Sequence, residues 1–295
     1  MKRREFIMLL GSAAAAAWPL AARAQNPAKS NQAAANQVGQ VATLQGSATV
    51  TRVNAATAIA LQVNSPIFKN DTLETGANSS LGVTFDDETT FSLSANTRIV
   101  VNEFVYQEAG NTNAASFSVA IGTAAFVASL VAKTGDMKIT TPIATLGIRG
   151  TTGVVDVPAG GGAGGGGEPR IKLYPDTDGY VGRIEVFNPQ GARLGALTQG
   201  ASAFALRPGA GGRLEAVPFQ IPPQEAARDR GVLQRLRFSH AIGRQMTIRR
   251  RGSRGGNRPG RNNPRRSGGP RGPGGNPRKP GPPRRANPSG PKPKH

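Results

Sequence analysis

Apolar and polar residues alternate along most of the chain between residues 38 and 217, which is the pattern of strands that bury one face. The segment VGQVATLQGSATVTR alternates on both sides of Gly46, which predicts two short strands joined by a tight turn. The segment LGVTFDDETTFSLSANTRIVV alternates around residues 86–89, which predicts a hairpin with a polar, solvated tip. With the further short runs that follow, the pattern predicts an all-β fold of antiparallel strands, either a β-sandwich or a short β-solenoid.

Two segments interrupt the alternation. Residues 158–169 are rich in glycine and predict a flexible loop, which separates a β-domain at 38–157 from closing strands of the same domain at 170–217. Residues 223–248 predict one C-terminal helix, because prolines precede them, an acid lies in the first turn and apolar residues recur on one face. The acid is Glu225, and the apolar residues of that face are Val232, Leu233 and Leu236.

Residues 1–24 have the pattern of an export signal, with a basic start, an apolar run and a small-x-small site at Ala22 and Ala24. The apolar run is shorter than the roughly 18 residues of a membrane-spanning helix, and no later run approaches that length. Arg3 and Arg4 resemble a twin-arginine signal, so twin-arginine and Sec export both remain open. We therefore expect a periplasmic or secreted protein without a transmembrane helix, starting with a linker at 25–37.

Residues 249–295 contain 15 Lys and Arg, no acidic residue and no apolar residue other than Ala and Pro. Because such a segment has nothing to bury, we predict a disordered tail. It carries most of the net charge of +20, and residues 25–248 carry only +2. We expect it to contact an anionic envelope polymer or lipid surface electrostatically, and without aromatic residues we expect no specific nucleic-acid binding. The residues predicted to contact polyanions are Arg249, Arg250, Arg251, Arg254, Arg258, Arg261, Arg265 and Arg266.

Candidate catalytic groups are few. The chain has no cysteine, which removes disulfide, thiol and Cys-metal chemistry. It has two histidines, so a Ser-His-acid set would depend on His240 in the predicted helix. Asp86, Asp87 and Glu88 are adjacent in a turn and point to different sides, which does not suit a spaced acid/base pair. We expect no enzyme activity, no catalytic residue and no cofactor.

One short segment resembles the start of a calcium loop. Asp176 and Asp178 precede a glycine in an Asp-x-Asp-Gly sequence, which begins many such loops. The bidentate glutamate and the other oxygen ligands that calcium needs do not follow at the expected spacing. We keep these two residues as a weak calcium candidate and favour an Asp-Gly turn between strands.

The segment TPIATLGIRGTTGVV places a proline, glycines and a single arginine within strand sequence. One interpretation makes Arg149 an anion ligand, with backbone N–H groups approaching at the glycines. The other makes the segment a fold-specifying turn, in which Arg149 satisfies carbonyl groups or pairs with an acid such as Asp156. Because no helix that could cradle a phosphate follows the glycines, we favour the turn.

From about residue 38 to residue 206 the order of motifs resembles the FecR domain. The opening GQVATLQGSATVTR is similar to the family's first strands, and GRIEVFNPQGARLGALTQGASAFAL is similar to its closing strands. Glu88 departs from the pattern, because the family usually has glycine there, and the glycine-rich insert is a second departure. The central pattern is carried by Asp71, Thr72, Thr75, Ser80, Leu81, Asp87 and Leu93, and the signature by Thr141, Pro142, Ala144, Arg149, Gly150 and Thr151.

The FecR proteins best known for iron uptake regulation are anti-sigma regulators with a cytoplasmic segment, one membrane helix and this domain in the periplasm. The resemblance implies the periplasmic module alone. We therefore expect a non-catalytic exported binding or scaffold protein of the cell envelope, tethered to anionic surfaces by its tail. The alternative is an accessory in cell-surface signalling or transport regulation that binds a membrane or sigma-regulatory partner in trans. A third, enzymatic hypothesis is a carbohydrate-active β-scaffold that depends on His240.

Overall fold

The computed structural model describes residues 37–53, 55, 57–108, 110, 112–160 and 167–255. The predicted export signal, almost all of the linker, the middle of the glycine-rich loop and the basic segment from residue 256 lie outside the described residues. The signal residues Arg3, Arg4, Ala22 and Ala24 and the polyanion candidates Arg258, Arg261, Arg265 and Arg266 therefore remain predictions.

The described residues form two β-sheets, which we call sheet A and sheet B. In spatial order sheet A contains β4 (Pro66–Phe68), β1 (Gln37–Gln45), β6 (Ser80–Phe85), β7 (Thr90–Leu93), β9 (Ala114–Val127), β12 (Thr152–Val157), β13 (Arg170–Tyr174), β16 (Ser202–Pro208) and β17 (Leu214–Pro218). Sheet B contains β3 (Ile59–Ala60), β2 (Ala48–Thr51), β5 (Thr72–Thr75), β8 (Arg98–Val105), β9, β10 (Asp136–Thr140), β11 (Thr145–Arg149), β14 (Arg183–Phe187) and β15 (Arg193–Leu197).

Strand β9 belongs to both sheets and joins them. Its first part pairs with β8 and β10 in sheet B, and its last part pairs with β7 and β12 in sheet A. The change of sheet falls at Gly122, which has a φ of 94° and has no room for a Cβ because Thr97 lies against it. All described pairings are antiparallel except the parallel pair β9–β10.

The core lies between the two sheets and contains side chains from both. Phe91 of sheet A packs against Phe117 of sheet B with 4.7 Å between ring centroids, and Phe85 stacks on Phe104 at 5.3 Å. All-β architecture is therefore confirmed, and successive single strands or strand pairs of the chain alternate between two packed sheets. The turn at Gly46 joins β1 in sheet A to β2 in sheet B, so these two strands do not pair with each other.

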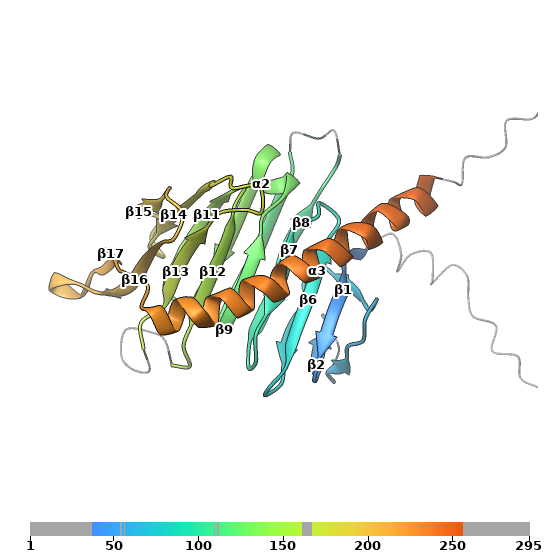
Figure 1. Ribbon diagram of the computed structural model, residues 1–295, viewed down its shortest axis with the longest axis horizontal. Helices are drawn as coiled ribbons and strands as arrows, with labels where there is room; N and C mark the ends of the chain where they lie inside the picture. Colours follow the sequence, from blue (N-terminus) through green and yellow to red (C-terminus); the bar gives the residue numbers. More distant parts are fainter. Residues whose placement is uncertain are drawn as a thin grey trace, which may run out of the picture. The chain divides into compact units, whose positions relative to one another are not determined.

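Two α-helices and a short 3-10 helix, η1 (Ala210–Gly212), accompany the sheets in the described part of the chain. The short α2 (Leu130–Thr134), which the sequence pattern did not predict, lies between β9 and β10. The predicted C-terminal helix is confirmed as α3 (Pro223–Gly255), which extends past the predicted end at residue 248. Figure 1 shows α3 crossing the outer face of sheet A from β13 to β6 and β1. Among the described residues no helix is both long and apolar enough to span a bilayer.

Few apolar residues connect α3 to sheet A. A small second cluster, separate from the main core, contains Ala125, Val154, Val232, Leu233 and Leu236. Elsewhere the helix contacts the sheet through hydrogen bonds and through close approach at small residues. The Thr43 and Ser239 hydroxyl groups lie 2.6 Å apart, and a Cβ on Gly243 would overlap the side chain of Thr84. The helix therefore depends on polar contacts and small residues for much of its attachment.

Candidate functional site

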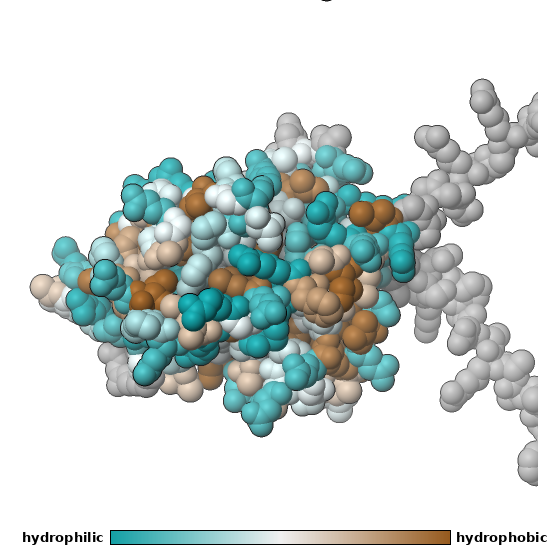
Figure 2. Space-filling model, in the orientation of Figure 1, coloured by the Kyte–Doolittle hydropathy of each residue, from teal (hydrophilic) through white to brown (hydrophobic). Residues whose placement is uncertain are grey.

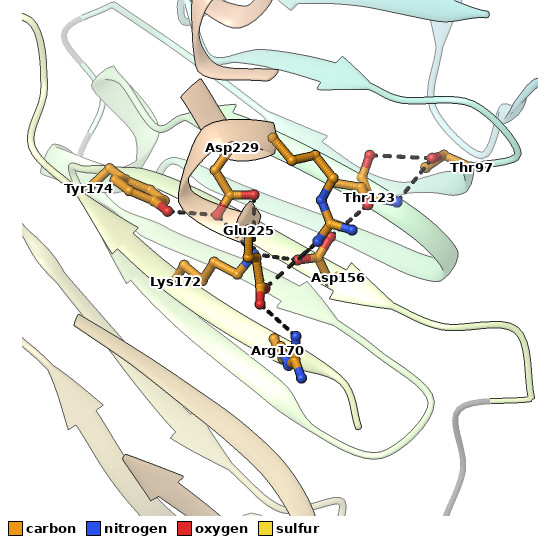
Figure 3. A network of polar contacts seen from close by, with 9 residues as sticks. Thr97, Thr123, Asp156, Arg170, Lys172, Tyr174, Glu225 and Asp229 are labelled. Carbon is orange, nitrogen blue, oxygen red and sulfur yellow. Dashed lines mark hydrogen bonds and ion pairs between the residues drawn. The ribbon is translucent and has the colours of Figure 1, made fainter. Parts of the chain in front are cut away.

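A buried lysine connects the first turns of α3 to sheet A. Ile171 and Leu173 of β13 point into the main core, so the alternation places Lys172 on the opposite face, beneath the helix. Its side chain is fully buried, and its Nζ lies 2.7 Å from Asp156 of β12, 2.6 Å from Glu225 and 2.9 Å from Asp229. We call these four residues the Lys172 cluster (Figure 3).

The local structure explains why these groups meet. Glu225 and Asp229 are four residues apart, so both lie on the side of α3 that faces the sheet. Asp156 alternates with the core residues Val155 and Val157 in the neighbouring strand, which places its carboxylate on the outer face as well.

Further polar groups surround the Lys172 cluster. Arg170 lies 2.6 Å from Glu225, and Arg228 lies 3.7 Å from both Asp156 and Glu225. Tyr174 donates a hydrogen bond of 2.7 Å to Asp229, and Thr123 donates one of 2.6 Å to Asp156. Three cations therefore face three carboxylates, and the cluster with its neighbours is electrically balanced.

The electrostatics keep Lys172 charged. Burial alone would lower its pKa, but the Asp156 carboxylate and the hydrogen bonds to Asp156, Glu225 and Asp229 outweigh burial, so the pKa is raised. Burial and the Asp229 carboxylate raise the pKa of Tyr174, which keeps its hydroxyl group protonated as a donor. A lysine that is charged, buried and surrounded by carboxylates is not a free nucleophile or base. The arrangement suits attachment of α3.

An open cleft of about 380 Å³ lies beside the Lys172 cluster. Its described lining includes Asn96, Thr123, Asp156, Arg170 and Arg228. Asp156, Arg170 and Arg228 are engaged in the ion pairs just described, and Glu168 also lines the cleft. Two acids therefore face two arginines, and the cleft presents no concentrated charge of one sign.

The predicted signature residues form a hairpin turn and its neighbouring strand. Thr141 begins the turn between β10 and β11, where its Oγ1 accepts a 3.1 Å hydrogen bond from the Ala144 N–H. Pro142 lies in the same turn. Gly150 has a φ of 44°, and the buried Thr151 accepts a hydrogen bond of 3.2 Å from Gly182.

Arg149 contacts a carbonyl group and an acid, as the turn hypothesis suggested, but the acid is not Asp156. Its guanidinium donates a 2.7 Å hydrogen bond to the Gly135 carbonyl and lies 4.0 Å from Asp136. The suggested partner Asp156 instead pairs with Lys172, because it points to the outer face of sheet A. Thr141 and Arg149 thus stabilise the β10–β11 hairpin, and Thr151 connects the residues after β11 to Gly182.

The calcium candidates lie in the turn between β13 and β14. Asp176 accepts a 2.5 Å hydrogen bond from Thr152, and Asp178 accepts one of 3.0 Å from the Tyr180 N–H. These contacts are those of an Asp-Gly turn that is fixed to β12. In the part of the chain that the structure describes, no group of three or more His, Asp and Glu could hold a metal ion.

The hairpin tip at residues 86–89 is not the solvated turn that the sequence suggested. Asp87 is fully buried and accepts hydrogen bonds from the Thr89 N–H, the Thr89 hydroxyl group and the Val131 N–H in α2. Burial raises the pKa of Asp87 despite these three donors. The Val131 donor in α2 is 44 residues from Asp87, so the local sequence does not indicate this contact.

The other two acids of this tip contact α3. Glu88 has a φ of 71°, a left-handed conformation that favours glycine, and its carboxylate pairs with Arg244 at 2.8 Å. Asp86 pairs with Arg250. The FecR pattern usually has glycine at this position. Here Glu88 takes the left-handed conformation and also forms an ion pair with α3.

Two of the predicted polyanion contacts are instead used within the domain. Arg250 pairs with Asp86, and Arg251 donates to the Asp86 carbonyl and lies over the ring of Tyr106 at 5.5 Å from its centroid. Arg249, Arg250 and Arg251 belong to α3, as does the backbone of Arg254. The predicted start of the tail at residue 249 is therefore wrong. The helix continues past this residue because ion pairs to the hairpin tip stabilise it in place of apolar contacts.

His240 lies on α3 with its Nδ1 3.1 Å from the Thr90 hydroxyl group. Burial, with a smaller contribution from Arg244, lowers its pKa from the ordinary value of 6.5, whereas Glu88 and Asp176 act in the opposite direction. This histidine has a hydroxyl partner on sheet A and no carboxylate within hydrogen-bond distance among the described residues. Its position is that of a half-buried contact between helix and sheet.

We expect His240 to make stability depend on pH. Its pKa is lower in the folded protein than in the unfolded chain, so protonation below about pH 6.5 favours unfolding. The free energy of unfolding should fall as the pH decreases from 7.5 toward the folded pKa, with a slope of at most about 1.4 kcal/mol per pH unit for one proton. Urea unfolding of the native chain and of H240N across this range measures the difference. Parallel curves for the two proteins would contradict the expectation.

The main residues of this site were missed by sequence reasoning. The signal was present in RIKLY, where a lysine occupies an outward position of a strand, and in the two acids spaced four residues apart in the predicted helix. Nothing local indicated that the helix would cover this strand, so no local pattern singled out Lys172, Tyr174 or Asp229.

The fold and the site together define an all-β domain whose outer sheet face is covered by a C-terminal helix, which is held by a balanced charge cluster. Residues 71–163 match the family model described as FecR protein, so the chain contains a FecR domain. The match runs from the start of β5 past the end of β12. Of the Lys172 cluster it includes only Asp156, because β13 and α3 lie beyond it. The FecR domain supports a role related to signalling regulation.

Two crystal structures of a candidate anti-sigma factor from Parabacteroides distasonis ATCC 8503 resemble this chain. Each has 12% sequence identity and a TM-score of 0.35, and the similarity covers 50% of this chain and 60% of the other. The chain thus spans about three fifths of the length of these structures. No curated protein shows a significant sequence match.

Proposed function

We propose that the protein is a non-catalytic, exported FecR-domain binding module of the cell envelope, in the periplasm or secreted, which its basic C-terminal segment holds at an anionic surface. The FecR match supports the binding module, and the export pattern of residues 1–24 supports the location. The 11 Lys and Arg from Arg258 to Lys294, without any acid, support the anionic surface.

The anchoring of the end of α3 is the observation that carries this proposal. Arg250 pairs with Asp86, and Arg251 contacts the Asp86 carbonyl, Tyr106 and Glu108. The basic segment therefore follows directly from a helix end that is fixed to the FecR domain. A charged segment attached at such a point can bring the whole domain to a surface without occupying its other faces.

The absence of catalysis in the proposal is supported by how the reactive side chains are engaged. Lys172 is charged and paired, His240 contacts Thr90, and Asp87 accepts three hydrogen bonds in the core. None of these three residues is among the described residues that line the open cleft beside Arg170 and Arg228. A hydrolytic activity that is lost in H240A would contradict the proposal.

The proposal is tested by neutralising the basic segment in an otherwise intact chain. The protein from Gln25 to His295 is compared with a variant in which the 11 Lys and Arg from Arg258 to Lys294 become Gln. We expect the native protein to bind lipopolysaccharide and anionic vesicles at low salt, and the variant to bind at least about tenfold more weakly. Binding of the native protein should decline steeply as salt increases. Equal binding by both proteins at every salt concentration would contradict the proposed tether.

The FecR match also favours a second candidate function, in which the domain binds a membrane or sigma-regulatory partner in trans. This role would use a face of the β-domain, and the basic segment would be incidental. Deleting the gene should then change transcription from one set of sigma-dependent promoters. Restoration of that transcription by the variant with the neutralised basic segment would favour this role over the tether. Unchanged transcription in the deletion strain would contradict it.

A further inference from the structure

The solvent side of α3 is a cationic surface without acids. The helix has two acidic residues, Glu225 and Asp229, and both are buried against sheet A. The other charged residues of α3 are all arginines. Figure 2 views the molecule from the side that carries α3 and shows teal residues along the helix, with separate brown patches between them.

Four arginines on this side have no ion-pair partner within the described ranges of the chain. They are Arg230, Arg235, Arg237 and Arg249, and all four are exposed. Arg228 and Arg244 are engaged by the Lys172 cluster and by Glu88. Unpaired guanidinium groups keep their capacity to bind phosphate groups in bidentate fashion.

Two large apolar side chains stand among these arginines. Phe238 is 63% exposed and Ile248 is 59% exposed. They are ten residues apart, which corresponds to about 15 Å along a helix, and both lie on the side away from the sheet. We call the four arginines with Phe238 and Ile248 the arginine face of α3.

We propose that the arginine face of α3 docks on a bilayer surface that contains anionic phospholipids. This inference rests on the proposed envelope location and adds an ordered docking surface to the contact proposed for the basic segment. Arginines at the level of the lipid phosphates, with aromatic and aliphatic side chains reaching below them, are the arrangement of helices that lie in a membrane interface. The charge of the face, which contains four arginines and no acid, is complementary to such a surface.

The apolar residues distinguish a bilayer from other polyanions. A nucleic acid could stack a base on Phe238, but it offers no apolar layer for Ile248. A bilayer accommodates both side chains, because its acyl region lies just beneath the phosphates. The cationic row also continues along the sequence into the basic segment, which adds attraction to the same anionic surface.

A single tryptophan reports directly on insertion. The only tryptophan of the chain is Trp18 in the predicted export signal, so the chain from Gln25 has none and Phe238→Trp introduces a unique fluorophore. With vesicles of 30% phosphatidylglycerol in phosphatidylcholine, we expect the emission of F238W to shift to shorter wavelength and to be quenched by brominated acyl chains. Vesicles of phosphatidylcholine alone should leave the emission unchanged.

Charge variants test the arginines with a matched control. R230Q/R235Q/R237Q removes three unpaired arginines from the face, and K69Q/R207Q/R213Q removes three exposed cations from elsewhere in the β-domain. We expect the first variant to bind the anionic vesicles on the order of 100-fold more weakly, because each of the three cations near an anionic membrane contributes about a factor of five. The control should bind within about threefold of the native protein. Circular dichroism confirms that both variants are folded.

The outcomes separate this inference from the proposed tether. If neutralising the basic segment weakens binding but F238W is not quenched by brominated lipid, the tether stands and the docking face is wrong. If F238W is still quenched after that neutralisation and binding is not weakened, the docking face stands and the tether is wrong. Equal losses in R230Q/R235Q/R237Q and in the control would overturn the inference. The variant I248S is also tested for binding to single-stranded DNA. An equal loss of binding to DNA and to vesicles would overturn the inference as well.

Discussion

Replacing Lys172 with methionine should lower the free energy of unfolding by about 3–5 kcal/mol. The change removes one buried cation and leaves three carboxylates beneath α3, of which Asp229 is only 1% exposed. The nearby Arg170 and Arg228 are partly exposed and cannot enter the space that Lys172 occupies without moving β13 or the helix. Denaturant unfolding monitored by circular dichroism measures the loss.

The exposed ion pair of Lys138 with Asp136 supplies the control. Their side chains are 2.6 Å apart but about half exposed, so K138M should cost no more than about 1 kcal/mol. Adding D229N to K172M should recover part of the loss, although D229N alone destabilises the protein, because it removes one of the uncompensated charges. If K172M and K138M cost the same, the Lys172 cluster does not attach α3, and our interpretation of the site is wrong.

The sequence was most informative where structure depends on neighbours along the chain. The alternation around residues 86–89 predicted the hairpin of β6 and β7, and these strands pair in that way. It could not show which sheet a strand joins, because alternation states only that one face is buried. The turn at Gly46 illustrates this, since it leads from sheet A to sheet B and not into a hairpin partner.

The candidate site depends on contacts between distant parts of the chain, which is why it was not predicted. The outward position of Lys172 was readable from RIKLY, but its burial results from a helix more than 50 residues later in the sequence. Asp87 was misread for the same reason, because its partner Val131 comes from α2. The composition of the segment from residue 249 predicted a disordered tail, but Arg250 lies in α3 and its ion pair with Asp86 stabilises the helix there.

The two glycines of α3 should respond to alanine with opposite signs. Gly231 lies in the helix with nothing closer to a new Cβ than an Arg235 nitrogen at 3.9 Å, so G231A should raise the free energy of unfolding by about 0.5–1 kcal/mol. At Gly243 a Cβ would overlap Thr84 of β6, so the same gain in helix propensity is outweighed by overpacking. We expect G243A to lower the free energy of unfolding by about 1–2 kcal/mol. Thermal and denaturant unfolding of the two variants measure the contrast.

The double change G243A/T84A decides the cause of that loss. If the new methyl group displaces Thr84, truncating Thr84 removes the overlap and G243A becomes neutral or stabilising in the T84A background. Thr84 also shares a 3.0 Å hydrogen bond with Thr90, the residue that contacts His240, so T84A alone has its own cost and is the reference for the double variant. An unchanged loss from G243A in that background would mean that α3 does not lie on β6 as closely as Gly243 and Thr84 indicate. A decrease in the free energy of unfolding of G231A would mean that a Cβ at residue 231 does meet a neighbouring atom.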